Sequence, residues 1–145
     1  MSASIKRGER GFVTIWMLGL CVMLFFLGGI ALDMWRAFSE RRGLAAMADA
    51  AAMAGASGID EELYRTTGIV ELDDRPGGRA ETLAAQHLAA QDDDASVTGA
   101  TITVTRQAVV VEVDGSIDFT LLKLFFDAGD DFALKVVAQA EPRAG

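Results

Sequence analysis

The stretch FVTIWMLGLCVMLFFLGGIAL, residues Phe12–Leu32, contains no charged side chain. About 20 apolar residues, at ~1.5 Å rise per residue, match the ~30 Å hydrocarbon core of a bilayer. Backbone groups in lipid must hydrogen-bond within their own segment, so the run is predicted to be helical. Trp16 and Trp35 stand roughly 28 Å apart along such a helix, where aromatic side chains meet the two membrane surfaces. We therefore predict one transmembrane helix over residues 12–32.

This apolar run differs from a cleaved signal peptide. The apolar part of a signal peptide is only ~7–15 residues long and is followed closely by a small-x-small site. Here the run is longer, and Asp33 and Arg36 follow it. The nearest Ala-x-Ala, at Ala46 and Ala48, lies beyond the arginine pair 41–42. The segment is expected to remain as a single anchor.

The charge distribution bears on orientation and on partners. Lysine and arginine give a tie across the span, with Lys6, Arg7 and Arg10 before it and Arg36, Arg41 and Arg42 after it. Residues 43–145 carry seven basic and eighteen acidic side chains, a net charge of −11. The anionic cytoplasmic leaflet repels such a domain, which favours the amino terminus inside and the bulk outside. Nucleic acid is excluded as a partner because it requires a basic surface.

The chain therefore divides into four expected parts. Residues 1–11 form a basic cytoplasmic tail, 12–32 the transmembrane helix, 33–58 a helical stalk and 59–145 a small extracytoplasmic α+β domain. The one cysteine, Cys21, sits in the span, so an intramolecular disulfide is excluded.

The stalk is rich in alanine between Gly43 and Gly58. Alanine is the best helix former, so one helix of roughly 45 residues is expected from near Phe12 to near Ser57, against a mean of ~11–12. Small residues such as Ala51 and Gly55 lie four apart and let another backbone approach closely. Two interpretations stay open: packing against other helices in an assembly, including copies of this chain, or packing under this chain's own sheet.

The remaining chain predicts one helix on a three-stranded antiparallel sheet. A second helix is expected over about Arg79–Gln91, and a short strand near 69–72. Alternating apolar positions then mark three strands, which need a helix on their apolar face: Ile102 and Val104; Val109, Val111 and Val113, continuing to Ile117 and Phe119 after a kink at Gly115; and Leu134, Val136, Ala138 and Ala140. The connection near 106–107 lacks favoured turn residues, which leaves the register open. Residues 121–126 are expected to form a helical turn over the sheet or an exposed contact patch.

No motif for catalysis, cofactor binding or metal binding is found in the sequence. His87 lies on an apolar helical stripe and is interpreted as a core histidine, because a zinc site draws on three or four ligands. Ser57 fails the Gly-x-Ser-x-Gly pattern because Ile59 replaces the second glycine. The acidic runs 92–94 and 127–131 do not fit an EF-hand loop and are interpreted as solvated loops. We expect no catalytic, cofactor-binding or metal-binding residues, and no enzyme.

Two stretches resemble a known family. RGERGFVTIW at residues 7–16 leads into the span, and RRGLAAMADAAAMAGA at residues 41–56 follows it. This arrangement is similar to the TadE/TadG-like Flp (tight adherence) pilus-assembly proteins over about residues 6–58. The resemblance implies a bacterial pilus or related secretion system, a cytoplasmic amino terminus in the inner membrane and an exported carboxy-terminal domain. It also implies other minor pilins and the assembly platform as partners, beside the lipid bilayer.

The resemblance leaves processing at Gly11–Phe12 open. Members processed like prepilins carry a glutamate five residues after the cleaved glycine, whereas that position here is Trp16. The first functional hypothesis is a membrane-anchored, minor pilin-like assembly component. The alternative is a membrane-tethered module that binds a ligand or a protein outside any pilus.

Overall fold

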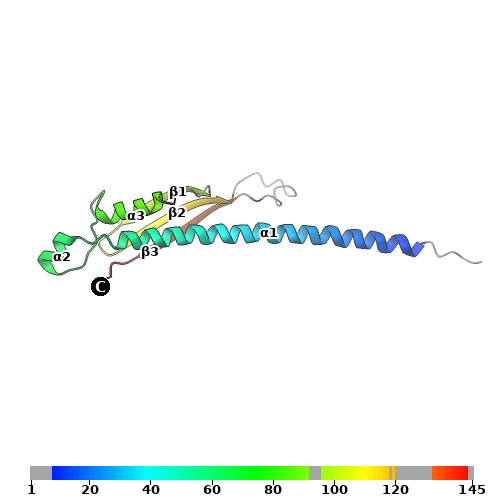
Figure 1. Cartoon of the computed structure of the whole chain (residues 1–145), viewed down its shortest axis with the longest axis horizontal. Coiled ribbons are helices and arrows are strands. Elements are labelled where there is room, and N and C mark those ends of the chain that lie inside the picture. The colour runs from blue at the N-terminus through cyan, green and yellow to red at the C-terminus, as the bar shows by residue number, and fades with distance from the viewer. Residues whose placement is uncertain (1–7, 92–95, 118, 120–131, 144–145) are drawn as a thin grey trace, which may run out of the picture. The chain divides into compact units, whose positions relative to one another are not determined.

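A computed structural model of the chain describes residues 8–91, 96–117, 119 and 132–143. Its elements follow in the order α1, α2, α3, β1, β2, β3 (Figure 1). The chain divides into two compact units. The first comprises residues 1–36 and 119–129, and the second comprises residues 37–118 and 130–145.

The first unit is dominated by α1, whose full extent is Gly8–Ala56 (49 residues). Proline, which would break a helix interior, does not occur in this range. The predicted long helix is thereby confirmed. By length and composition α1 can cross a membrane: its most apolar stretch has a mean hydropathy of 2.4, and none of that stretch is buried.

The second unit holds a three-stranded antiparallel sheet in the order β1-β2-β3, formed by β1 (Val97–Val104), β2 (Val109–Ile117) and β3 (Phe132–Ala140). Burial alternates strictly along the central strand β2, where Val109, Val111 and Val113 are fully buried. One face of the sheet is therefore covered and the other faces solvent. The predicted α+β fold class, with a long apolar helix followed by a helix packed on this sheet, is confirmed.

The covered face of the sheet packs against α3 (Arg79–Ala89) and against the part of α1 that belongs to this unit. Most of the buried helix residues in this core are alanines, beside Leu44 and Met47: Ala48, Ala51 and Ala52 from α1, and Ala80 and Ala84 from α3. A Cβ built on Gly55 would meet Val109 Cγ1 at 3.0 Å and the Ala80 carbonyl oxygen at 3.1 Å. Of the two interpretations of the alanine stretch, the structure shows packing under the chain's own sheet.

The connection between α1 and α3 contains a helix that was not predicted from the sequence. Helix α2 (Glu61–Thr67) begins at Asp60, whose carboxylate accepts hydrogen bonds from two backbone amides of its first turn, and ends at Gly68, where φ is 72°. The short strand predicted near 69–72 is reduced to a single bridge between Ile59 and Leu72. Two backbone hydrogen bonds link the two ends of this segment. The Asp60 amide donates to the Glu71 carbonyl at 2.9 Å, and the Asp73 amide donates to the Gly58 carbonyl at 3.1 Å.

The hairpin between β1 and β2 has a defined register, with Val104 opposite Val109. The amide of Thr105 donates to the carbonyl of Ala108 at 2.9 Å, and the Thr105 hydroxyl bonds both the carbonyl (3.0 Å) and the amide (3.1 Å) of Ala108. In addition, the Leu72 amide donates to the Arg106 carbonyl at 3.0 Å. A threonine side chain and a tertiary contact thus replace the turn residues that the sequence lacks.

The kink expected at Gly115 is found on the neighbouring strand instead. The register of β1 shifts between Val97 and Gly99, opposite Gly115, while β2 pairs regularly with β3. A Cβ on Gly115 would lie 2.5 Å from Leu44 Cδ1 and 2.9 Å from the Ser96 carbonyl oxygen. A side chain at position 115 would therefore collide with both the Leu44 side chain of α1 and the backbone of Ser96. The expectation for residues 121–126 lies outside the described residues.

Candidate functional site

The apolar segment of α1 exposes most of its large side chains, while Phe26 and Ile30 on one side of the helix are half-buried. Trp16 is 65% exposed and Phe25 is 84% exposed. A helix that is apolar all round and unburied has no favourable contact with water, so this surface needs lipid or another apolar partner. The rings of Phe12 and Trp16 pack at a centroid distance of 6.4 Å near one end of this surface. The segment is thus suited to anchor the chain in a membrane.

Asp33 follows this apolar surface directly and is buried, with only 3% of its surface exposed. A buried carboxylate is costly unless it is paired or hydrogen-bonded, and Asp33 does take part in such interactions. From the sequence, Asp33 is expected to end the apolar run and to form an interfacial ladder of opposite charges with Arg36 and Glu40 on one side of the helix. A charged residue directly after an uncharged run was the available signal, but it cannot reveal burial.

A cluster of charged side chains surrounds Asp73 between α2 and the start of α3. Its carboxylate accepts from Arg75 Nε at 2.7 Å and from the Arg79 amide at 3.1 Å. The side-chain hydrogen bond from Arg75 is the main reason that the pKa of Asp73 lies below its usual value, and the amide of Arg79 adds to the effect. Arg79 also pairs with Glu61, and Arg75 reaches Asp60 at 3.5 Å. These contacts link α2 to the start of α3. The charged groups involved are paired with one another within the cluster.

The residues considered for chemistry are not brought together. The Ser57 hydroxyl donates to the Ala54 carbonyl at 2.6 Å, so it acts at the end of α1. His87 is half-buried on α3, and its Nε2 lies 3.3 Å from the Gln91 side-chain nitrogen. Within the described part of the chain, three or more His, Cys, Asp or Glu side chains do not gather at any point that could hold a metal ion. The acidic runs 92–94 and 127–131 lie outside the described residues.

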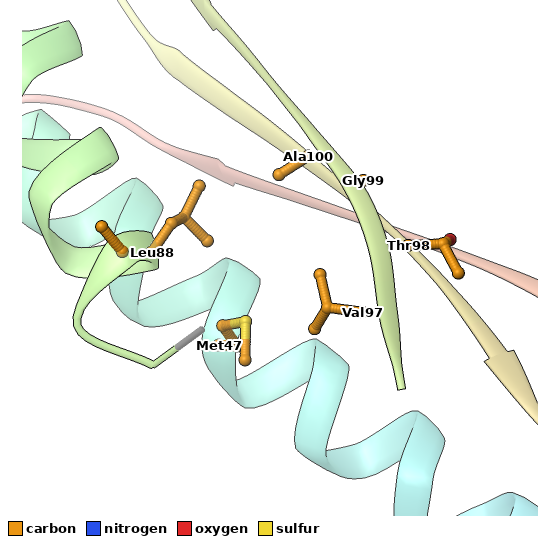
Figure 2. Close-up of a pocket in the computed structure, with 7 residues that line it drawn as sticks. Met47, Leu88, Val97, Thr98, Gly99 and Ala100 are labelled. Carbon is orange, nitrogen blue, oxygen red and sulfur yellow. The ribbon is translucent and has the colours of Figure 1, made fainter. Parts of the chain in front are cut away.

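One cavity of about 250 Å³ opens between the helices and the beginning of β1. Met47 of α1, Leu88 of α3 and residues 97–100 of β1 line it. Figure 2 shows Met47, Leu88 and Val97 on the helix side of β1, while Thr98 points to the opposite side. The side chains on the helix side of β1 are apolar and the strand's backbone supplies the polar part of the lining, so the helix side of the cavity suits an aliphatic group rather than a charged ligand.

These features define a class: a protein with an apolar helical anchor that continues into the core of a small α+β domain. Residues 11–58 match the model of a family described as putative Flp pilus-assembly TadE/G-like. The matched range covers the apolar run and the alanine-rich part of α1, where the resemblance was read from the sequence. Neither the curated proteins nor the solved structures contain a match to the chain. The findings together support a membrane-anchored protein with a pilus-related role.

Proposed function

We propose that this chain is a membrane-anchored, minor pilin-like structural component of a bacterial Flp pilus or related secretion system, and that it is not an enzyme. The match of residues 11–58 to the pilus-assembly family carries the proposal. The matched range includes both the helix surface that needs lipid and the helix surface that builds the domain core. Other pilins and assembly-platform proteins are its proposed partners, beside the lipid bilayer.

The proposed topology places the amino terminus in the cytoplasm and residues 59–145 outside the inner membrane. The net charge of −11 over residues 43–145 supports this orientation, because anionic lipid on the cytoplasmic face repels an acidic domain. The four-part division at residues 11, 32 and 58 is retained as a proposal about the membrane, with one refinement. Residues 44–55 contribute to the domain core as well as to the stalk.

The function is tested by deleting the gene and measuring fibres sheared from the cell surface. Deletion is expected to abolish or strongly reduce the fibres, and the full-length chain supplied in trans is expected to restore them. Unchanged fibre yield in the deletion strain would contradict the proposal. The mass of the mature amino terminus, measured in the same strain, determines whether the Gly11–Phe12 bond is cut.

The topology is tested with single cysteines placed in a Cys21→Ser background. Thr66→Cys lies on the exposed surface of α2, and Ser4→Cys lies in the amino-terminal tail. A membrane-impermeant maleimide added to spheroplasts is expected to label the Thr66→Cys chain at once and the Ser4→Cys chain only after lysis. The reverse pattern would place the domain in the cytoplasm.

A further inference from the structure

The sheet of the second unit has two open edges. In the described residues, β1 and β3 each pair only with β2. Strand β1 carries no charged residue and no proline over its eight residues, and the single charge of β3, Lys135, pairs with Glu112 at 2.7 Å. Native proteins normally protect long edges with charges or proline, since unpaired backbone groups are templates for another strand. Both edges are thus suited to strand addition.

The helix-covered face of the sheet differs between these two edges. Two rows cross it from β1 to β3: Val97, Gly115 and Leu134, and Ala100, Val113 and Val136. At the β1 end of the rows lies the cavity of about 250 Å³. At the β3 end, Leu134 and Val136 are only half-buried. The same molecule therefore offers an apolar hollow at one edge and incompletely buried aliphatic side chains at the other.

We propose that a second copy of this chain adds its β3 to the open edge of β1, with its Leu134 and Val136 entering the cavity beside Met47. Continuation of the two rows into the neighbour places these side chains at the hollow. The volume of about 250 Å³ exceeds the roughly 150 Å³ of a protein cavity that holds a benzene ring, so aliphatic side chains fit.

The direction of the strands agrees with this pairing. Strands β1 and β3 both run antiparallel to β2, so they are parallel to each other. Two copies of the domain that differ only by a translation in the membrane plane bring β1 of one copy beside β3 of the next as a parallel pair. This step rests on the proposed membrane anchoring. Such a contact is head-to-tail and leaves a free edge at each end, so it extends to further copies.

Charge favours the edge over the rest of the domain surface as a contact between copies. Residues 43–145 carry a net charge of −11, so two domains repel each other wherever acidic surfaces meet. The uncharged strand β1 and its apolar cavity form a surface on which identical acidic domains can approach. A second copy is therefore the occupant whose complementary part is already present on the chain.

The pairing is tested by disulfide trapping of the full-length chain in its native membrane, in a Cys21→Ser background. On the open face of the sheet, Thr101 and Val137 lie in one row across Glu112, and both are exposed. Edge-to-edge addition places Thr101 of one copy next to Val137 of its neighbour, at about 4.8 Å between strands, which a disulfide can bridge. Oxidation of the double variant Thr101→Cys, Val137→Cys is expected to give a ladder of dimers, trimers and higher multimers.

Three matched variants make the result decisive. Thr101→Cys alone and the pair Thr66→Cys, Val137→Cys are expected to remain monomeric. Efficient cross-linking of Thr101→Cys alone would indicate a two-fold β1–β1 contact and overturn the proposal, as would a double variant no more cross-linked than the Thr66 control. Adding Ala100→Leu, which fills the exposed side of the cavity, is expected to abolish the ladder without changing the unfolding temperature. A ladder that persists with Ala100→Leu would contradict the role of the cavity.

This outcome can be separated from that of the proposed function. If fibre production depends on the chain but the ladder is absent, the pairing of copies is wrong and the assembly role stands. If the ladder forms but fibres persist after gene deletion, the assembly role is wrong and the pairing stands.

Discussion

At the scale of single residues, glycines and one aspartate determine how closely the elements of the second unit approach. A Cβ on Gly58 would lie 2.5 Å from the backbone of Ala80, and a Cβ on Gly115 would lie 2.5 Å from Leu44. Asp73 acts differently, because its carboxylate bonds a side chain and a helix-start amide at once. The two glycines are fixed by neighbours distant in sequence, whereas Asp73 bonds two residues shortly after it in the chain.

Gly115→Ala is expected to destabilise the domain by about 1–3 kcal/mol, since the added methyl overpacks the contact between α1 and β2. Denaturant unfolding of the full chain in detergent measures the loss. Gly99→Ala is the matched control, because a Cβ there would meet only Asp114 Oδ2 at 4.0 Å. Equal stability of the two variants would show that α1 does not approach β2 this closely.

Asp73→Asn is expected to cost about 1 kcal/mol at pH 7, as is typical of a lost charged hydrogen bond near a helix start. The folded-state pKa of Asp73 lies below its unfolded value, so its contribution is fully present above the unfolded pKa of about 3.9 and is lost as the pH falls through the folded pKa. Unfolding midpoints of the variant and the native chain should therefore converge in acid.

The control for this pH dependence is Asp49→Asn, which changes an exposed aspartate on α1. Its effect on stability is expected to be small at every pH. A difference between Asp73→Asn and the native chain that stays constant down to pH 2 would contradict the assignment.

At the scale of elements, α1 combines two surfaces on one helix. Its first part exposes large apolar side chains, whereas Ala48, Ala51 and Ala52 in its last part are buried in the core. Small residues at these positions bring the helix axis close to the sheet. A bulky substitution on this surface therefore disturbs the domain itself before it can affect any contact with another helix.

Ala51→Leu is expected to destabilise the domain by about 1–3 kcal/mol through overpacking. Ala46→Leu, on the exposed side of the same helix, is expected to change stability by less than about 0.5 kcal/mol. Thermal unfolding of both variants in detergent gives the comparison. A destabilising effect of Ala46→Leu as large as that of Ala51→Leu would contradict the observed face of α1.

The predictability of the elements follows from how local their signals are. Helix α1, helix α3 and the alternation in β2 and β3 could be predicted because composition and periodicity act within each element. Helix α2 was missed because seven residues hold too few turns for a period, although Asp60 followed by two glutamates was a usable start signal. The cavity beside Met47 and the burial of Asp33 depend on distant segments, which a single sequence does not place.

At the scale of the whole molecule, the chain combines an apolar anchor with a strongly acidic domain. The anchor needs lipid, and the acidic domain needs water and is kept apart from other acidic surfaces by its charge. In the proposed topology the membrane concentrates copies whose acidic surfaces repel each other, and the proposed contact between them uses the uncharged β1 edge.

Replacing Leu20 and Leu24 with arginine is expected to release the chain from the membrane or prevent its insertion. Each arginine costs about 2.5–3.5 kcal/mol at the centre of a membrane helix. Alkaline carbonate extraction followed by centrifugation measures the change: the native chain should stay in the pellet and the double variant should not. Phe38→Arg together with Ser39→Arg, outside the apolar run, is the control and should remain in the pellet.

The alanines in the last part of α1 also matter while the chain is being synthesised. Residues 44–55 leave the ribosome well before β2 and β3, which later cover them. During that interval a stripe of leucines would aggregate or join the adjacent bilayer span, whereas alanine offers little apolar area for either. Small side chains on this surface therefore limit the apolar area that the nascent chain exposes before its sheet is made.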